Sequence, residues 1–207
     1  MSNKIWDISP AIRPGIAVWP GDAPFQSDTT WEIGNGCPVK VSKISMSTHT
    51  GAHCDAPSHY STDGLPIDQV NLATYIGPCR VIHVHGEQVI QADQLKPFLK
   101  DVPERVLLRT YTSSPVDWDS AFTSISAEAI HLLASHGVKL VGIDTPSLDH
   151  QESKTLDAHL AVHQHGLAIL EGIVLDDITP GDYELIALPL KLTGLDASPV
   201  RAILRSL

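Results

Sequence analysis

One short segment of the chain, residues 48–60, concentrates side chains that bind divalent metals. It reads Thr-His-Thr-Gly-Ala-His-Cys-Asp-Ala-Pro-Ser-His-Tyr and contains His49, His53, Asp55 and His59. Imidazole nitrogens and carboxylate oxygens together suit zinc, manganese or iron(II). Because the segment has no C-x-x-C pair, the donor set favours a catalytic site with an open position over a closed structural one. The alternative is a hydrogen-bonded turn that holds no metal.

Gly51 and Pro57 decide the conformation expected for this segment. His49 and His53 are spaced as on one face of a helix, but a glycine and a proline nearby both oppose a helix. We therefore predict the end of a strand that runs into a loop, with His53 and Asp55 on one face of the strand. A turn at the flexible Gly51 would then bring His49 toward them.

A second group of titratable side chains lies between residues 157 and 171. His159 and His163 are one turn apart on a predicted helix, and Glu171 lies in or just after an apolar strand. An unpaired carboxylate is costly in apolar surroundings, so we expect a cation beside Glu171. The alternative is a surface helix with solvated histidines and an ion pair between Glu171 and a Lys or Arg.

Two loops rich in Pro, Gly and Asp, residues 13–22 and 144–149, are typical of segments that display binding groups. Trp19 lies in the first of them. This side chain either lines a binding site or packs on the core between Val18 and Pro20.

The elements that must position these groups alternate between strands and helices. Short aliphatic runs bounded by Gly, Pro or Asp predict core strands at residues 39–46, 80–84, 106–109, 139–143, 167–170 and 184–192. One helix is predicted from an N-cap at Ser126 to a stop at Gly137. Another is predicted over 156–164, with a cap at Ser153 or Thr155 and a stop at Gly166. The class expected is α/β, and with no linker or repeat we expect a single domain over 1–207.

Composition excludes several function classes. The chain has 207 residues, 43% of them hydrophobic and 18% charged, which is enough for one substantial core and too apolar for disorder. A net charge of -10 has the wrong sign for neutralising nucleic-acid phosphates. No apolar run approaches the roughly 20 residues that span a bilayer, and the opening residues lack a secretory-signal pattern. Three widely spaced cysteines, Cys37, Cys54 and Cys79, argue against a disulfide framework. We therefore expect a cytoplasmic protein with a small-molecule substrate and no nucleic-acid or membrane partner.

The segment from His49 to His59 resembles the signature H-x-G-T-H-x-D-x-P-x-H of the cyclase-like metal-dependent hydrolases. Within that family it is most similar to the bacterial kynurenine formamidases. Every fixed position agrees except Ala52, where the wider family usually carries Thr. The likeness extends to residues 5–10, 18–22, 142–147 and 154–171. It implies a swivelling β/β/α fold with a mixed sheet and few helices, usually assembled as a homodimer.

The resemblance also implies roles for individual residues. It implies two divalent metal ions, with zinc the first candidate and manganese next, and Asp55 as the bridging ligand. One ion would be held by His49, His53 and Asp55, and the other by Asp55, His159 and Glu171. His59 would be the general acid/base, and Trp19 would line the substrate pocket.

The activity implied by the resemblance is hydrolysis of N-formyl-L-kynurenine to L-kynurenine and formate, a step of tryptophan degradation. Two alternatives stay open: a related enzyme that hydrolyses another small amide or cyclic amide, and a metal-binding protein without catalysis. A serine hydrolase is disfavoured because no G-x-S-x-G occurs, and a dinucleotide-binding protein because no G-x-G-x-x-G follows a strand.

Overall fold

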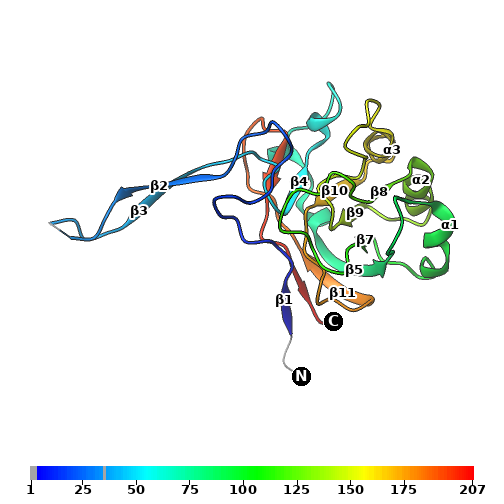
Figure 1. Ribbon diagram of the computed structural model, residues 1–207. Coiled ribbons are helices and arrows are strands. Elements are labelled where there is room, and N and C mark those ends of the chain that lie inside the picture. Colours follow the sequence, from blue (N-terminus) through cyan, green and yellow to red (C-terminus); the bar gives the residue numbers. More distant parts are fainter. Residues whose placement is uncertain (1–3, 35) are drawn as a thin grey trace.

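The computed structural model describes residues 4–34 and 36–207, and its main element is a curled, mixed, nine-stranded sheet (Figure 1). The strand order is β1-β13-β11-β5-β7-β9-β10-β4-β12. Its strands are β1 (Ile5–Asp7), β4 (His53–Asp55), β5 (Ile76–His83), β7 (Arg105–Arg109), β9 (Leu140–Ile143), β10 (Ala168–Glu171), β11 (Gly181–Ile186), β12 (Ala197–Pro199) and β13 (Ile203–Arg205). The α/β class predicted from the sequence is confirmed.

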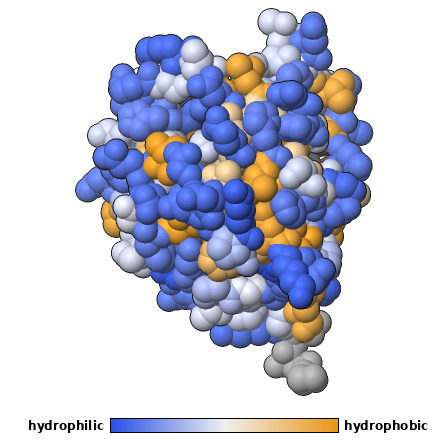
Figure 2. Space-filling view, turned by 90° about the vertical axis from the view of Figure 1, so that its right-hand side faces the viewer, coloured by the Kyte–Doolittle hydropathy of each residue, from blue (hydrophilic) through white to orange (hydrophobic). Residues whose placement is uncertain are grey.

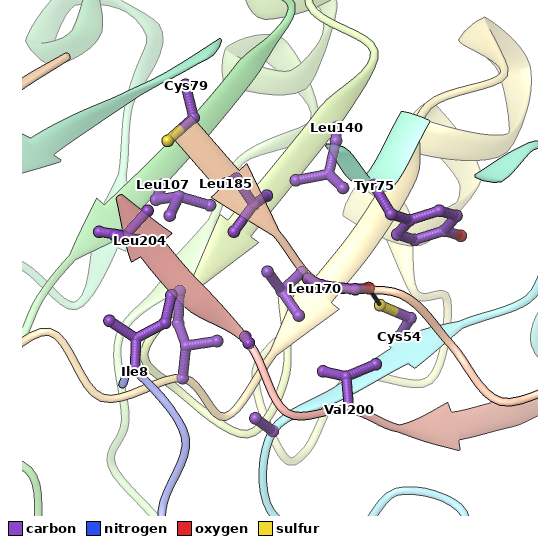
Figure 3. Close-up of a cluster of buried hydrophobic side chains, with 14 of the residues drawn as sticks. Ile8, Cys54, Tyr75, Cys79, Leu107, Leu140, Leu170, Leu185, Val200 and Leu204 are labelled. Carbon is purple, nitrogen blue, oxygen red and sulfur yellow. Dashed lines mark hydrogen bonds between the residues drawn. The ribbon is translucent and has the colours of Figure 1, made fainter. Parts of the chain in front are cut away.

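The centre of the sheet is parallel and buried on both faces. Strands β5, β7, β9 and β10 run parallel, whereas β4 and β11 join them antiparallel. Continuous aliphatic runs suit such strands, since neither face meets water. Alternate residues feed two cores. Leu107, Leu140 and Leu170 enter the core shown in Figure 3, and Val106, Val141 and Ile169 enter the core on the other face.

The helices lie together on one side of the sheet (Figure 1). They are α1 (Ala92–Leu95), α2 (Ala127–Ser135) and α3 (Asp157–His165), with short 3-10 turns η1 (Pro57–His59), η2 (Ile67–Gln69), η3 (Leu72–Tyr75) and η4 (Lys96–Phe98). The face of the molecule that carries them is mostly hydrophilic, interrupted by a few apolar groups (Figure 2). No helix among the described residues combines the length and the apolar character that a membrane crossing requires.

The predicted helix boundaries are confirmed except at the start of α3. Ser126 caps α2, its side chain accepting from the Ala129 N–H, and Gly166 ends α3 in the left-handed region at a φ of 64°. The predicted cap of α3 at Ser153 or Thr155 is wrong. The N-cap residue is Leu156, whose side chain makes no capping hydrogen bond. The carboxylate of Asp149, in the preceding loop, accepts hydrogen bonds from the backbone N–H groups of Ala158 and His159 instead.

Two of the predicted strands need correction. The run 184–192 is a strand only to Ile186, and β11 begins earlier, at Gly181. Pro189 has no N–H to donate to a neighbouring strand, which is consistent with the early end. The run 39–46 contains β3 (Val41–Ser45), but this strand does not belong to the core sheet.

Instead, β3 pairs with β2 (Gln26–Trp31) in an antiparallel ribbon that projects from the body, here called the arm (Figure 1). Every residue of both strands is exposed. A second short pair joins β6 (Val89–Ile90) to β8 (Ser124–Ile125). The three cysteines are free thiols, as expected from their spacing.

Candidate metal centre

The pairing of β4 with β10 builds the centre of the site. The register places His53 opposite Glu171 and Asp55 opposite Ile169. Because side chains alternate across a strand, His53, Asp55 and Glu171 share one face. Cys54 and Leu170, opposite each other between them, enter the core on the other face (Figure 3). The strand predicted for this segment is therefore confirmed, and one antiparallel pair brings an imidazole and two carboxylates together.

A turn at Gly51 brings the next histidine to this group. Gly51 has a φ of +69°, and the chain reverses so that His49 Nδ1 lies 3.1 Å from Asp55 Oδ1. The Gly51 carbonyl accepts a hydrogen bond of 2.9 Å from His53 Nδ1. The predicted turn thus positions two imidazoles, one through the path of the chain and one through a carbonyl oxygen.

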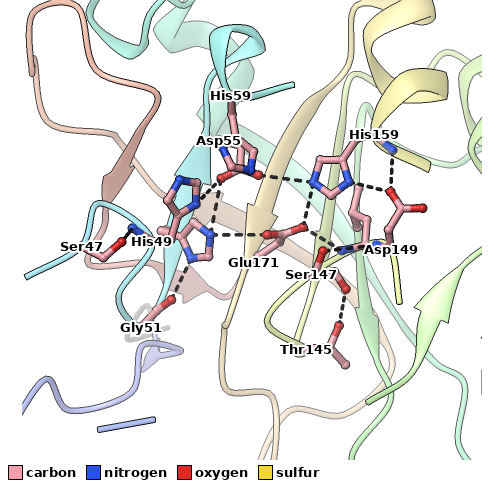
Figure 4. Close-up of polar contacts among 12 residues, drawn as sticks. Ser47, His49, Gly51, Asp55, His59, Thr145, Ser147, Asp149, His159 and Glu171 are labelled. Carbon is pink, nitrogen blue, oxygen red and sulfur yellow. Dashed lines mark hydrogen bonds and ion pairs between the residues drawn. The ribbon is translucent and has the colours of Figure 1, made fainter. Parts of the chain in front are cut away.

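Helix α3 supplies the remaining imidazole (Figure 4). His159 Nε2 lies 3.5 Å from Asp55 Oδ2 and 3.7 Å from Glu171 Oε1. Its Nδ1 donates to Asp149 Oδ2 at 2.6 Å, and the same carboxylate accepts from the backbone N–H groups of Ala158 and His159. The Asp149 carboxylate therefore both caps the helix and fixes the orientation of the ring, as carboxylates behind metal-ligating histidines do.

Three buried atoms of this group have no hydrogen-bond partner among the described residues: His53 Nε2, Asp55 Oδ1 and Asp55 Oδ2. The side chains of Asp55 and Glu171 are 1% and 3% exposed. Since Gly51 and Asp149 take the Nδ1 protons of His53 and His159, the lone pairs at Nε2 face carboxylate oxygens 3.3 to 3.7 Å away. Lone pairs and carboxylates repel unless a cation lies between them. The donor set therefore fits a divalent metal.

Protons take the place of that cation in the metal-free protein. Burial lowers the pKa of His53, but the neighbouring carboxylates of Asp55 and Glu171, 3.4 and 3.3 Å from its Nε2, outweigh burial and raise this pKa to about 10. Burial also lowers the pKa of His159, but the carboxylates of Asp149 and Asp55 outweigh burial and raise this pKa to about 10. Metal binding must then displace these protons.

The structure brings five of the sequence candidates together in this cluster, which we call the metal centre: His49, His53, Asp55, His159 and Glu171. His59 lies at its edge with 35% of its side chain exposed, and a nitrogen of His59 is within 4.8 Å of ligand atoms of His49 and Asp55. His163 does not join the cluster, because it lies on the exposed side of α3.

Two carboxylates that the sequence did not single out support the metal centre. Asp149 holds His159, and Asp196 Oδ2 lies 2.9 Å from His49 Nε2 and 3.6 Å from His59 Nδ1. Asp196 directly precedes β12, which pairs with β4, so its position depends on a contact far along the chain. The only signal for Asp149 was its place in the loop 144–149.

A cavity of about 360 Å³ opens beside the metal centre, a size typical of small-molecule sites. Its lining includes His49, His53 and Gly172. Trp19 lines the wall, 37% exposed, and its ring meets Trp118 edge to face at a centroid distance of 5.3 Å. Trp19 thus lies on the cavity, one of the two positions considered from the sequence.

Residues 6–150 match the family described as "Putative cyclase", which is more than half of the chain. The chain belongs to the cyclase family. Among solved structures, a potential metal-dependent hydrolase with cyclase activity is 28% identical over 100% of this chain and 99% of its own, with a TM-score of 0.87. A "predicted metal-dependent hydrolase" from Bacillus stearothermophilus is 29% identical over 100% of both chains, with a TM-score of 0.85.

Isatin hydrolase A from Labrenzia aggregata shares the fold at 23% identity, covering 99% of this chain and 94% of its own, with a TM-score of 0.83. The cyclase match ends before His159 and Glu171, whereas the similar structures cover the whole chain. The cyclase fold expected from the sequence is thereby confirmed.

Gly172 offers a test of how closely the metal centre depends on backbone contact. Its φ is +64°, and a Cβ there would lie 2.4 Å from the carbonyl oxygen of Gly51, the acceptor for His53. We expect Gly172→Ala to weaken zinc binding about 10- to 100-fold, because the carbonyl must move and release the ring. Competition with a chromophoric chelator measures this affinity.

Gly166→Ala is the matched control. Gly166 has the same φ of +64°, but nothing lies within 4 Å of its would-be Cβ. Both variants should lose about 1 to 2 kcal/mol of stability through the left-handed backbone, and only Gly172→Ala should lose zinc affinity. Equal zinc binding by the two variants would contradict this account.

Proposed function

We propose that this cyclase-family protein is a metal-dependent amide hydrolase that converts N-formyl-L-kynurenine to L-kynurenine and formate. The observation that carries the proposal is the buried cluster of His53, Asp55, His159 and Glu171, whose unpartnered atoms fit a divalent metal beside an aromatic-lined cavity. The formyl substrate is supported by the resemblance of His49–His59 to the kynurenine formamidases, including alanine at position 52.

Two metal ions, zinc in the first instance, are part of the proposal. Asp55 Oδ1 faces His49 Nδ1 and His53 Nε2, at 3.1 and 3.4 Å, whereas Oδ2 faces His159 Nε2 at 3.5 Å. Opposite oxygens directed at different imidazoles support a bridging role for Asp55. Glu171 would complete the second ligand set with Asp55 and His159. Divalent cations held there supply Lewis acidity, which lowers the pKa of water and polarises a carbonyl oxygen.

His59 is proposed to move the protons. Burial lowers its pKa below the ordinary value, so the ring is neutral near pH 7 and can accept a proton. As the water oxygen bonds to the formyl carbon, His59 takes the water proton. When the C–N bond breaks, His59 returns that proton to the aryl amine nitrogen and formate departs. Asp196, 3.6 Å from His59 Nδ1, favours the protonated ring between these steps.

The aromatic wall suits the aryl part of such a substrate. Trp19 and Trp118 meet edge to face, and the ring centroid of Phe122 lies 6.2 Å from that of Trp19. The Trp118 indole N–H donates to Gln151 Oε1 at 2.7 Å, which fixes the ring. An arylamine packed here places its ring on apolar surface while the formyl group reaches the metal centre.

A second candidate is hydrolysis of another small amide or of a cyclic amide. The metal centre determines the reaction class, whereas the cavity wall determines the substrate, so the same ligands would serve both. A metal-binding protein without catalysis is the remaining alternative. A substrate panel of formyl arylamines, imides, lactones and isatin distinguishes all three, because each predicts a different set of hydrolysed compounds.

Metal dependence is the first property to measure. Purified protein should hydrolyse N-formyl-L-kynurenine, lose that activity after chelation and regain it with zinc at about two metal ions per chain. Kynurenine absorbance follows turnover, and elemental analysis of the same samples gives the metal content. Bound metal with hydrolysis of only the cyclic amides would favour the second candidate, and bound metal with no hydrolysis of any compound would favour the third.

The proposed roles of Asp55 and His59 predict different losses. Asp55→Ala should lose both metal and activity. His59→Ala should keep the metal and lose about 10²- to 10⁴-fold in kcat, the usual contribution of a general acid/base. His163→Ala, an exposed histidine on α3, is the control and should resemble the parent protein in both measurements. Full turnover by either of the first two variants would contradict the mechanism.

We also propose that the protein forms a homodimer through the arm. Trp31 and Ile44 on the arm are each 57% exposed, and an isolated two-stranded ribbon is marginally stable in water. The resemblance implies a second copy of the chain, and we propose that this copy covers these side chains.

Sedimentation velocity should therefore find a dimer. The double variant Trp31→Ser with Ile44→Ser should shift it toward monomer, because the apolar contact is lost. Leu72→Ser, which replaces a 53% exposed side chain outside the arm, should leave the dimer intact. A monomeric parent protein, or a dimer that survives the arm substitutions, would overturn this arrangement.

A further inference from the structure

Five of the six arginines form side-chain hydrogen bonds or ion pairs with other described residues, and Arg13 is the exception. Arg80, Arg201 and Arg205 pair with Asp182, Asp7 and Glu184, and Arg105 and Arg109 donate to backbone carbonyls. For Arg13, no hydrogen bond or ion pair joins the guanidinium to another of the residues that the structure describes. Among the described residues lining the cavity, Arg13 is also the only Lys or Arg. The Arg13 guanidinium, without a partner among the described residues, therefore lines the cavity in which a ligand would bind.

The backbone around Arg13 is well fixed. Its carbonyl accepts from the Ile16 N–H at 2.9 Å across a turn that contains Pro14 and Gly15. The same loop lies against Gly51, where a Cβ would be 3.4 Å from Ile12. Arg13 is thus held on a short, turn-fixed segment next to the backbone that positions His49 and His53.

The cavity lining also includes three aspartates, and two of them already accept hydrogen bonds. Asp144 accepts from the Thr110 N–H and hydroxyl and from the Tyr111 N–H. Asp119 accepts from the Tyr111 hydroxyl and the Ala121 N–H, each at 2.9 Å. Asp117 is exposed, lines the cavity and has no such partner in the part of the chain that is described.

The contact between Trp19 and Trp118 joins the two loops that carry Arg13 and Asp117. Asp117 directly precedes Trp118, and Arg13 belongs to the same turn-rich loop as Trp19. The loop of Asp117 is itself held by carboxylates, because Asp176 accepts from the Ser114 N–H and hydroxyl, in addition to the contacts of Asp144. One cation and one anion are therefore held at an aromatic wall by two anchored loops.

We propose that Arg13 binds the α-carboxylate and Asp117 the α-ammonium group of the substrate, so that this pair selects amino-acid derivatives among aryl amides. A guanidinium matches a carboxylate with two parallel hydrogen bonds, and a carboxylate accepts from an ammonium. The inference rests on the proposed function, because it takes the aryl ring to lie on Trp19 and the formyl group to reach the metal centre. It adds the contacts that distinguish a free amino acid from a plain formyl arylamine.

The test compares N-formyl-L-kynurenine with formanilide, which keeps the formyl arylamine but lacks the amino-acid part. Arg13→Gln should lower kcat/KM for N-formyl-L-kynurenine about 10- to 100-fold, mainly through KM, as expected for a charge-assisted hydrogen bond. It should leave the value for formanilide within about twofold. Arg13→Lys should recover part of the loss, since it keeps the charge but not the paired geometry. Arg201→Gln, which removes an exposed arginine paired with Asp7, is the matched control.

Asp117→Asn is tested with a third compound, the N-formyl substrate without its α-amino group. The substitution should lower kcat/KM about tenfold for N-formyl-L-kynurenine and leave it unchanged for the compound without the amino group. Equal losses on both compounds, or no loss on either, would overturn the role of Asp117. The role of Arg13 would be overturned if Arg13→Gln lost equal activity on N-formyl-L-kynurenine and formanilide, or lost none on either compound.

Failure of the proposed function would be recognised separately, because the parent protein would then hydrolyse neither formyl compound. The inference can still be tested by calorimetric titration of the zinc-loaded protein with L-kynurenine and with 2-aminoacetophenone, which lacks the amino-acid part. Arg13→Gln should weaken L-kynurenine binding about 10- to 100-fold and leave 2-aminoacetophenone unaffected. Unchanged L-kynurenine binding would overturn the inference.

Discussion

The buried electrostatics of Asp55 and Glu171 constrain the rest of this structure. Two carboxylates that water barely reaches face the Nε2 atoms of two imidazoles, and without a proton or a metal ion between them that arrangement is strongly unfavourable. Strand pairing enforces it, because Glu171 and His53 are opposite residues on β10 and β4. Since the pairing of these strands and the binding of a cation favour the same geometry, metal binding and folding stability are thermodynamically coupled.

The scaffold meets this constraint because alternate side chains of β4 and β10 point to opposite faces of the sheet, one toward an apolar core and the other toward the metal centre. On β4, Cys54 enters an apolar core while its neighbours His53 and Asp55 face the metal centre. The core side provides the hydrophobic stabilisation that offsets the polar side. Close backbone approach completes the arrangement, since Gly172 lies against Gly51 where a side chain would collide. The positions of His49 and His53 are therefore set by regular strand geometry and two glycines, whereas α3 and Asp149 hold His159.

Sequence reasoning reached the parts of the site that are local and failed where distant segments meet. The turn at Gly51 and the strand end at His53 follow from residue type alone, and so does the helix that carries His159. The cap of α3 could not be found in the same way, because its acceptor, Asp149, lies in a preceding loop that only the tertiary fold brings to the helix. Asp196 reaches His49 through the pairing of β12 with β4, a contact for which the sequence has no short-range signal. The run 39–46 had a strand pattern, yet no pattern within it showed that it belongs to a projecting arm.

The two halves of the site depend on different kinds of structure. The metal centre rests on strand register and on α3, where a shift of one residue would turn a ligand to the opposite face. The cavity wall consists of loops, which carboxylates such as Asp144 and Asp176 tie to the sheet from outside the strand pairing. Substitutions on those loops can change which groups face the ligand without changing the register that holds His53, Asp55 and Glu171. Reaction class and substrate choice are thus physically separable in this fold, and the roles proposed for Arg13 and Asp117 assign specificity to charged side chains on the loops rather than to the metal ligands.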